Sequence, residues 1–147
     1  MLAAASIPLL VTAVNPVTGL LAALALVSYV WVYTPMKQHS PAALLVGAIP
    51  GAMPPLMGWT AVTGRIDWPG LILFAIMFIW QIPHFIAISV YREVEYTKAG
   101  LKTVPGSRGD KAAAWQMFAW SLLLLPVSLM LVPLDIAGPV YLTLASV

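Results

Sequence analysis

Charged residues are scarce in this 147-residue chain. Lysine, arginine, aspartate and glutamate make up only 8% of it, whereas soluble domains carry about 25%. Apolar residues account for 61%, and the mean hydropathy is +0.94. A water-soluble fold would therefore lack the polar side chains that it needs to cover its surface. The composition predicts an integral membrane protein whose main partner is the lipid bilayer.

Two further shortages exclude whole classes of site. The chain has no cysteine, so disulfides and thiolate-bound metals are excluded. It has only seven lysines and arginines, dispersed along the sequence, which is too few for a nucleic-acid surface. We therefore expect no nucleic-acid partner.

Long apolar segments are the most prominent feature of the sequence. A helix needs about 20 apolar residues to cross a bilayer. Four segments satisfy this requirement, at about residues 17–35, 42–62, 68–90 and 112–132. Shorter apolar segments at 1–14 and 136–147 are interpreted as partial spans. The pattern predicts an all-α, polytopic transmembrane helix bundle in one domain, and we expect the chain to be a fragment of a larger bundle.

The loops between these spans indicate an orientation. If each span crosses the membrane once, six basic residues lie on one side: Lys37, Arg92, Lys98, Lys102, Arg108 and Lys111. Only Arg65 lies on the other side. Because basic residues are retained on the cytoplasmic side, we predict a multi-pass protein of a bacterial or archaeal inner membrane. Residues 91–111 would form a cytoplasmic cap loop.

The third span carries an unusual polar stripe where it reaches this side, in "WQIPHFIAISVYREVEYTKAG". If its helix continues past His84, helical spacing places five residues on one face: His84, Ile88, Tyr91, Glu95 and Lys98. Ionisable residues at membrane depth are costly and usually face a cavity or a partner. The alternative is that His84 caps a neighbouring backbone group and the charges only solvate a helix end.

The charges in this stripe suggest a phosphate-bearing ligand. Glu93 and Glu95 point in opposing directions on a helix, so only Glu95 shares the His84 side. One carboxylate is at best half of a magnesium site. Basic neighbours such as Arg92 and Lys98 suit a phosphate group, although this signal is weak when it stands alone.

The segment "VGAIPGAMPPLMGW" is rich in helix breakers. Pro50, Pro54 and Pro55 each lack an amide hydrogen, which predicts lost helical hydrogen bonds and a broken backbone. Such a backbone survives in a membrane only when it is buried in protein or lines a cavity. Gly47 and Gly51 form a GxxxG pair that permits close helix approach. The segment is either a kinked packing helix or the wall of a pocket for a large apolar substrate.

A third segment, "YTPMK", ends the first full span and places Lys37 at the cytoplasmic mouth. A snorkelling lysine explains this position by itself. Lys37 is nevertheless expected on the same side of the membrane as the loop that carries Glu95, which adds weight to this position.

Together these three segments resemble the signature segments of the protohaem IX farnesyltransferases (haem O synthases), a family of UbiA-type membrane prenyltransferases. "GAIPGAMPPLMGW" followed by "WQIPHF" separates that family from the quinone-pathway prenyltransferases. The resemblance implies part of a nine-helix UbiA-type fold. It also implies transfer of a farnesyl group from farnesyl diphosphate to a vinyl group of haem B, giving haem O.

The resemblance further implies roles for single residues. In the family two acidic motifs bind the diphosphate through Mg²⁺, and the second, usually Asp-Tyr, reads Glu95-Tyr96 here. Glu95 would then bind the metal and assist ionisation of the allylic bond. Lys37, Arg92 and Lys98 would stabilise the leaving diphosphate and complete the catalytic set. The implied substrate-binding residues are Tyr33, Gln81, His84, Tyr91 and Tyr96, with His84 near the haem or the cation pocket.

The sequence departs from the family pattern in two places. The first acidic motif has no counterpart, because the only aspartates are Asp67, Asp110 and Asp135. The usual Pro-Met of the cap loop reads Lys102-Thr103. We therefore expect the chain to be inactive by itself.

The alternatives are another UbiA-type aromatic prenyltransferase, or a membrane transporter or assembly subunit that uses the broken helix as a substrate path. If the enzyme makes haem O, a hand-over to haem A synthase or to a terminal oxidase is expected.

Overall fold

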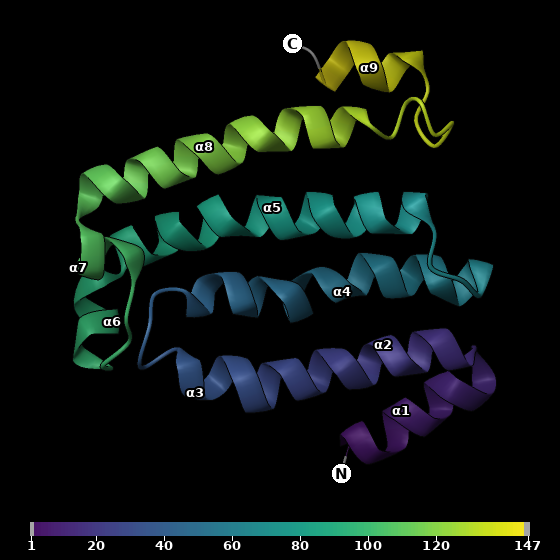
Figure 1. Ribbon diagram of the computed structural model, residues 1–147, viewed down its shortest axis with the longest axis horizontal. Coiled ribbons are helices and arrows are strands. Elements are labelled where there is room, and N and C mark those ends of the chain that lie inside the picture. Colours follow the sequence, from purple (N-terminus) through teal and green to yellow (C-terminus); the bar gives the residue numbers. More distant parts are fainter. Residues whose placement is uncertain (1, 146–147) are drawn as a thin grey trace.

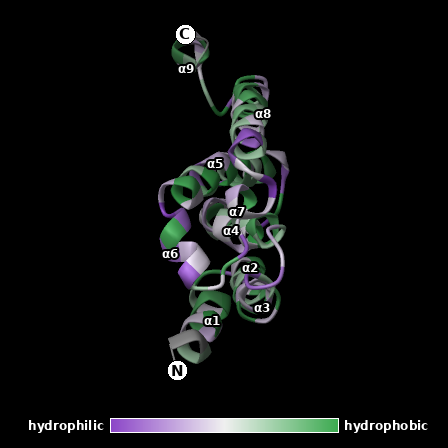
Figure 2. Ribbon diagram, turned by 90° about the vertical axis from the view of Figure 1, so that its left-hand side faces the viewer, coloured by the Kyte–Doolittle hydropathy of each residue, from purple (hydrophilic) through white to green (hydrophobic). Residues whose placement is uncertain are grey.

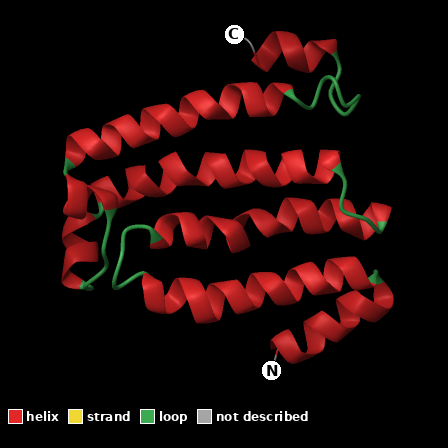
Figure 3. Cartoon of the chain, in the orientation of Figure 1, coloured by secondary structure: helices red, strands yellow, loops and turns green. Residues whose placement is uncertain are grey.

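The computed structural model describes residues 2–145, which form helices joined by short loops, with no strand in that range (Figure 3). Residues 1 and 146–147, at the outer edges of the expected partial spans, lie outside the described part. The elements are α1 (Leu2–Ala13), α2 (Pro16–Val27), the π-helix η1 (Ser28–Tyr33), α3 (Thr34–Met36), α4 (Ala43–Thr63), α5 (Trp68–Tyr91), α6 (Glu93–Lys98), α7 (Val104–Arg108), α8 (Asp110–Leu129) and α9 (Pro139–Ala145).

The long helices lie side by side in chain order and alternate in direction (Figure 1). The end-on view shows that they form a single layer, with α1 against α2 at one edge and α9 beyond α8 at the other (Figure 2). Four stretches are long and apolar enough to cross a membrane, at Pro16–Met36, Ala43–Thr63, Trp68–Tyr91 and Asp110–Leu129. The predicted all-α, multi-pass fold is confirmed.

The helix boundaries follow from side chains next to each turn. Asn15 precedes Pro16, and its side-chain oxygen accepts a hydrogen bond from the Thr18 N–H at 2.9 Å, which caps α2. Asp67 caps α5 in the same way. Gly64 ends α4 in the left-handed region at φ +70°, where a residue without Cβ is favoured.

The helix through the proline-rich segment is continuous, so the expectation of a broken backbone is wrong. Pro50, Pro54 and Pro55 all lie inside α4. Each proline removes only the bond that its own amide would have made, and the flanking bonds keep the helix together. The Gln81 side chain of α5 also donates to the Ala48 carbonyl at 2.9 Å, which joins this part of α4 to α5.

One buried hydrophobic cluster lies between α4, α5, α7 and α8. It comprises Ala48, Ile82, Ile86, Val104 and Ala113. Between membrane helices, close packing rather than exclusion of water provides the stabilisation. The small Ala48 and Ala113 side chains fit this requirement because they allow the helices to approach closely.

The six basic residues assigned to one side of the membrane lie at one end of the layer, which we call the basic end. It contains the α3–α4 loop, α6, α7 and the start of α8 (Figure 1). Figure 2 views the layer from this end, and α6 and the adjacent loops carry much of the hydrophilic colour. The Lys102 N–H donates to the Lys37 carbonyl at 3.2 Å, which joins the loop after α6 to the end of α3. Arg65 lies at the opposite end.

Candidate functional site

A cavity of about 780 Å³ is walled by α1, α2, η1, α4, α5 and the loop after α6. Near the basic end its lining includes Lys37, Tyr96 and Thr103, and further in it consists largely of small apolar side chains such as Ala22 and Ala25. The only charged side chains in the lining are lysines. The arrangement suits a molecule with an anionic head and an apolar tail.

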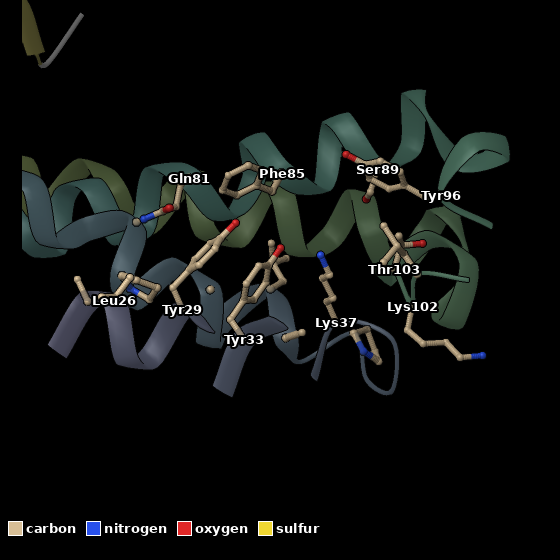
Figure 4. Close-up of a pocket in the computed structure, with 18 of the residues that line it drawn as sticks. Leu26, Tyr29, Tyr33, Lys37, Gln81, Phe85, Ser89, Tyr96, Lys102 and Thr103 are labelled. Atoms are coloured by element: carbon tan, nitrogen blue, oxygen red, sulfur yellow. The ribbon is translucent and has the colours of Figure 1, made fainter. Parts of the chain in front are cut away.

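The π-helix η1 places two tyrosines on the cavity side. Pro35 lacks an amide hydrogen and its ring crowds the carbonyl of Trp31, a recognised cause of helix distortion. The Thr34 N–H donates instead to the Tyr29 carbonyl, five residues earlier. The Thr34 hydroxyl donates to the same carbonyl at 2.9 Å. The Tyr29 and Tyr33 rings lie 5.2 Å apart, and Figure 4 shows both hydroxyls directed toward α5. π-Helical turns are frequent at functional sites.

The two glycines of the GxxxG pair make room for side chains of the site. A Cβ on Gly47 would lie 2.6 Å from the Tyr33 ring, and one on Gly51 would collide with Oε1 of Gln81. The predicted close approach is confirmed, although it is to side chains of η1 and α5. Gln81 is 5% exposed and its amide nitrogen is already bonded to Ala48, so its oxygen is the atom that remains for the cavity.

The two lysines of the lining differ in direction. In Figure 4 the Lys37 amine points into the space between η1 and α5, whereas the Lys102 amine extends away from the other labelled side chains. Among residues 2–145 the ion pairs are Arg65 with Asp67 and Arg92 with Glu95, so neither lysine has a carboxylate partner there. Lys37 is therefore the cation best placed to receive a phosphate group.

The comparisons with known proteins agree with this geometry. The sequence profile described as UbiA prenyltransferase family matches residues 1–147. The chain belongs to the UbiA prenyltransferase family. The resemblance noted from the sequence segments is thereby confirmed at the level of the family.

Several curated relatives are named protoheme IX farnesyltransferase. The protein of Sorangium cellulosum (strain So ce56) is 57% identical over 141 residues, which are 96% of this chain and 50% of that protein. The protein of Anaeromyxobacter sp. (strain Fw109-5) is 53% identical, over 97% of this chain and 48% of its own length. The protein of Myxococcus xanthus (strain DK1622) is 51% identical, over 98% and 49%. The chain thus spans about half the length of these relatives. No solved structure matches it significantly.

Four residues singled out from the sequence line the cavity together. They are Tyr33, Lys37, Gln81 and Tyr96. They come from η1, the end of α3, α5 and α6, and long-range packing brings them around one cavity. Tyr96 reaches the cavity although its neighbour Glu95 does not line it.

The expected continuous face from His84 to Lys98 is wrong. Helix α5 ends at Tyr91, and Arg92 leaves the helical region at φ −108° and ψ 28° before α6 begins. At that point the chain turns away from the direction of α5 (Figure 1). Positions before and after Arg92 therefore do not share a helical face.

The remaining predicted site residues lie outside the cavity lining. Tyr91 is 87% exposed, and His84 stacks on Trp80 with ring centroids 4.9 Å apart. The Arg92 guanidinium pairs with the exposed Glu95 carboxylate at 3.1 Å. Lys98, at the end of α6, is also exposed. The proposed roles of these residues in catalysis and substrate binding stay predictions.

The carboxylates of the described residues do not fit a magnesium site as they are placed. Within residues 2–145 no three His, Asp or Glu side chains come together in a group that could hold a metal ion. Glu95, the expected ligand, is exposed and already paired with Arg92. A magnesium site here would need oxygen ligands from elsewhere.

Many of the residues that line the cavity escaped the sequence analysis. Tyr29 lies four residues before Tyr33, and Phe85 and Ser89 follow Gln81 at intervals of four. A helical stripe that starts at Gln81 instead of His84 would have identified Phe85 and Ser89, and the spacing of four residues before Tyr33 would have identified Tyr29. Thr103 carried no such signal, because the position of its loop depends on packing near α3.

Proposed function

We propose that the complete protein containing this chain is a protohaem IX farnesyltransferase, which transfers farnesyl from farnesyl diphosphate to a vinyl group of haem B to give haem O. The observation that supports this proposal most strongly is the 57% identity to a protein of that name over nearly the whole chain. The cavity supports it, since a lysine marks one end and apolar side chains line the other.

In this proposal the diphosphate lies at the basic end beside Lys37. The positive amine stabilises the negative charge that grows on the diphosphate as the allylic C–O bond breaks. The farnesyl chain lies along Tyr33, Tyr29 and Leu26, where aromatic faces line its path. A ring face attracts positive charge, which favours the allylic cation there. The haem vinyl group then attacks this cation to form the new C–C bond, and water captures the carbocation left beside the porphyrin ring and releases a proton, which gives the hydroxylated side chain of haem O.

We expect Mg²⁺ to accompany the diphosphate and to neutralise its charge. The described carboxylates do not provide its site, so we assign its ligands to carboxylates outside this chain, with Glu95 as a candidate contributor. Lys37 and the tyrosines stabilise the diphosphate and the allylic cation with their own side chains.

The distribution of basic residues supports a location in the cell membrane with the basic end in the cytoplasm. Haem O released from the site would pass to haem A synthase or to a terminal oxidase. The transporter alternative depended on a broken helix, and the continuous α4 removes that support.

The test is the formation of haem O. The complete gene product is produced in a host that lacks its own enzyme, and membranes receive haem B and farnesyl diphosphate. Mass spectrometry should detect haem O, and membranes without the gene should form none. No product, while the Sorangium cellulosum relative forms haem O in parallel, would contradict the proposal. Prenylation of an added aromatic acid instead of haem would support the other UbiA-type activity.

The same host tests the expectation that these 147 residues are inactive by themselves. Membranes that carry only this chain should form no haem O, because the lining comes from one layer of helices and the magnesium ligands are incomplete. Formation of haem O by the chain alone would contradict that expectation.

A further inference from the structure

The cavity runs along one continuous helical stretch, from the charged end of the cavity to its apolar end. Helices α2, η1 and α3 are contiguous, and they present Lys37, Tyr33, Tyr29, Leu26 and Ala22 to the cavity at intervals of three or four residues. Lys37 and Ala22 are 15 residues apart, which corresponds to roughly 20 Å along a helix. Figure 4 shows Leu26 at the opposite end of this row from Lys37.

Helix α1 walls the inner part of the same cavity. It contributes Ile7, which is half-buried. Helix α1 runs antiparallel to α2, and a Cβ on Gly19 would collide with Val11, so the two helices are in close contact. The same antiparallel pairing places Ile7 opposite residues 22–26. Ile7 and Leu26 therefore limit the cavity from two sides at its inner end.

Hydrogen bonds hold this inner wall in place. The Asn15 amide donates to the Thr60 carbonyl of α4 at 2.8 Å, and the buried hydroxyls of Thr18 and Thr60 lie 2.9 Å apart. The turn between α1 and α2 is thereby fixed to α4. Because this turn is fixed, the side chains that α1 and α2 present to the cavity determine how much length it offers.

We propose that Ile7 and Leu26 set the number of isoprene units that the cavity accepts, an inference that rests on the prenyl transfer proposed above. Lys37 holds the diphosphate and so fixes one end of the substrate. The apolar tail extends from there along the tyrosines toward α1. A chain with one unit too many meets Ile7 and Leu26, and a chain with one unit too few leaves that space unfilled.

Two substitutions at the inner end of the cavity change the volume of its wall in opposite directions. Ile7→Phe adds volume to the wall, and Leu26→Ala removes it. In membranes carrying the complete protein, kcat/KM is measured for geranyl, farnesyl and geranylgeranyl diphosphate with haem B. One methylene in an apolar pocket changes selectivity by about tenfold or more. Ile7→Phe should therefore lower the farnesyl-to-geranyl ratio by about tenfold, and Leu26→Ala should raise the geranylgeranyl-to-farnesyl ratio by a similar factor.

Matched controls lie on the same helices. Leu9→Phe and Leu24→Ala change exposed residues that do not line the cavity, and they should keep the original ratios. If Ile7→Phe does not accumulate in membranes, Leu26→Ala decides alone. If Leu26→Ala transfers farnesyl with unchanged ratios, or if the controls shift equally, Ile7 and Leu26 do not set the number of isoprene units. The proposed function would remain intact in either case. Failure of the unaltered protein with all three diphosphates would overturn the proposed function.

Discussion

The two ends of the helical layer use their polar side chains differently. At the Arg65 end, Trp59 donates to the Asp67 carboxylate at 2.6 Å, and Arg65 pairs with the same carboxylate at 3.2 Å. Asn15 bridges α2 and α4 in a similar way. At the basic end, Lys37 points into a cavity and has no carboxylate partner among residues 2–145.

This difference separates polar groups that hold the fold from those that are available to a ligand. Hydrogen-bonded groups at the Arg65 end join neighbouring helices, and removing one of them leaves another without its partner. An unpaired lysine at the edge of a cavity contributes nothing of that kind. Substitutions at the two ends should therefore affect different measurements.

The largest effect is expected for Lys37→Ala in the complete protein. Loss of a charged partner at a ligand site costs about 2–5 kcal/mol, so kcat/KM for farnesyl diphosphate should fall about 100-fold or more. The amount of protein in the membrane should not change. Lys102→Ala is the matched control, and because its amine extends away from the cavity, a much smaller fall is expected. Equal falls would remove the distinction between the two lysines.

Glu95→Gln is expected to have the next largest effect on transfer. The substitution keeps the shape and removes the charge, so turnover should fall about tenfold if this carboxylate joins a magnesium site in the complete protein. Glu93→Gln should cost much less. A similar loss in both variants would indicate that the general charge of α6 matters, and not a specific ligand at Glu95.

Lys98→Ala tests the basic side chain at the end of the same helix. It should raise KM for farnesyl diphosphate by several-fold and leave kcat nearly unchanged, because an exposed cation mainly assists binding. A fall in kcat with an unchanged KM would instead assign Lys98 to the chemical step.

Asn15→Ala should act on stability instead of transfer. It removes the cap of α2 and the bond to the Thr60 carbonyl, which together contribute about 1–2 kcal/mol. Thermal unfolding in detergent should shift to lower temperature, while kcat/KM of the folded enzyme stays within about twofold. Gln38→Ala, an exposed change in the α3–α4 loop, is the control and should leave the melting temperature unchanged. An intact melting temperature in Asn15→Ala would show that this contact is dispensable.

The smallest effect concerns Asp67 and pH. Burial alone would raise the pKa of this carboxyl, but hydrogen bonds from Arg65, Trp59 and the Gly70 N–H hold it below its usual value. A lowered pKa stabilises the fold above the unfolded value of about 3.9, and this contribution is lost as pH falls through the folded value. Melting temperature should therefore fall on acidification toward about pH 3, and Asp67→Asn should flatten this fall. Parallel curves for the two proteins would contradict the assignment.

Much of the fold could be read from local features of the sequence. The apolar spans and the position of the basic residues depend only on length and composition, which are local properties. The start of α2 at Asn15 and Pro16 is likewise local, because it depends on a capping side chain and on the fixed φ of proline. The three prolines of α4 led to a wrong expectation, because each removes only one helical hydrogen bond and the flanking bonds keep the helix continuous.

The candidate site could be predicted only in part from the sequence. Tyr33, Lys37, Gln81 and Tyr96 were recognised from short segments, and the structure brings them to one cavity. The continuous face from His84 to Lys98 was predicted incorrectly, because the sequence does not mark the end of α5 at Tyr91. The packing of α5 against α4 decides that Gln81 faces inward and His84 outward.

The sequence by itself determined that this chain is a helical membrane protein with most of its basic residues on one side, because hydropathy and charge act residue by residue. Its signature segments supplied the resemblance to the UbiA type. Only the tertiary structure decided which residues share the cavity. The π-turn before Pro35 aims Tyr29 and Tyr33 at the space opposite Gly47 and Gln81. That meeting depends on contacts between residues far apart in the chain, and no local pattern encodes how distant helices are rotated against one another.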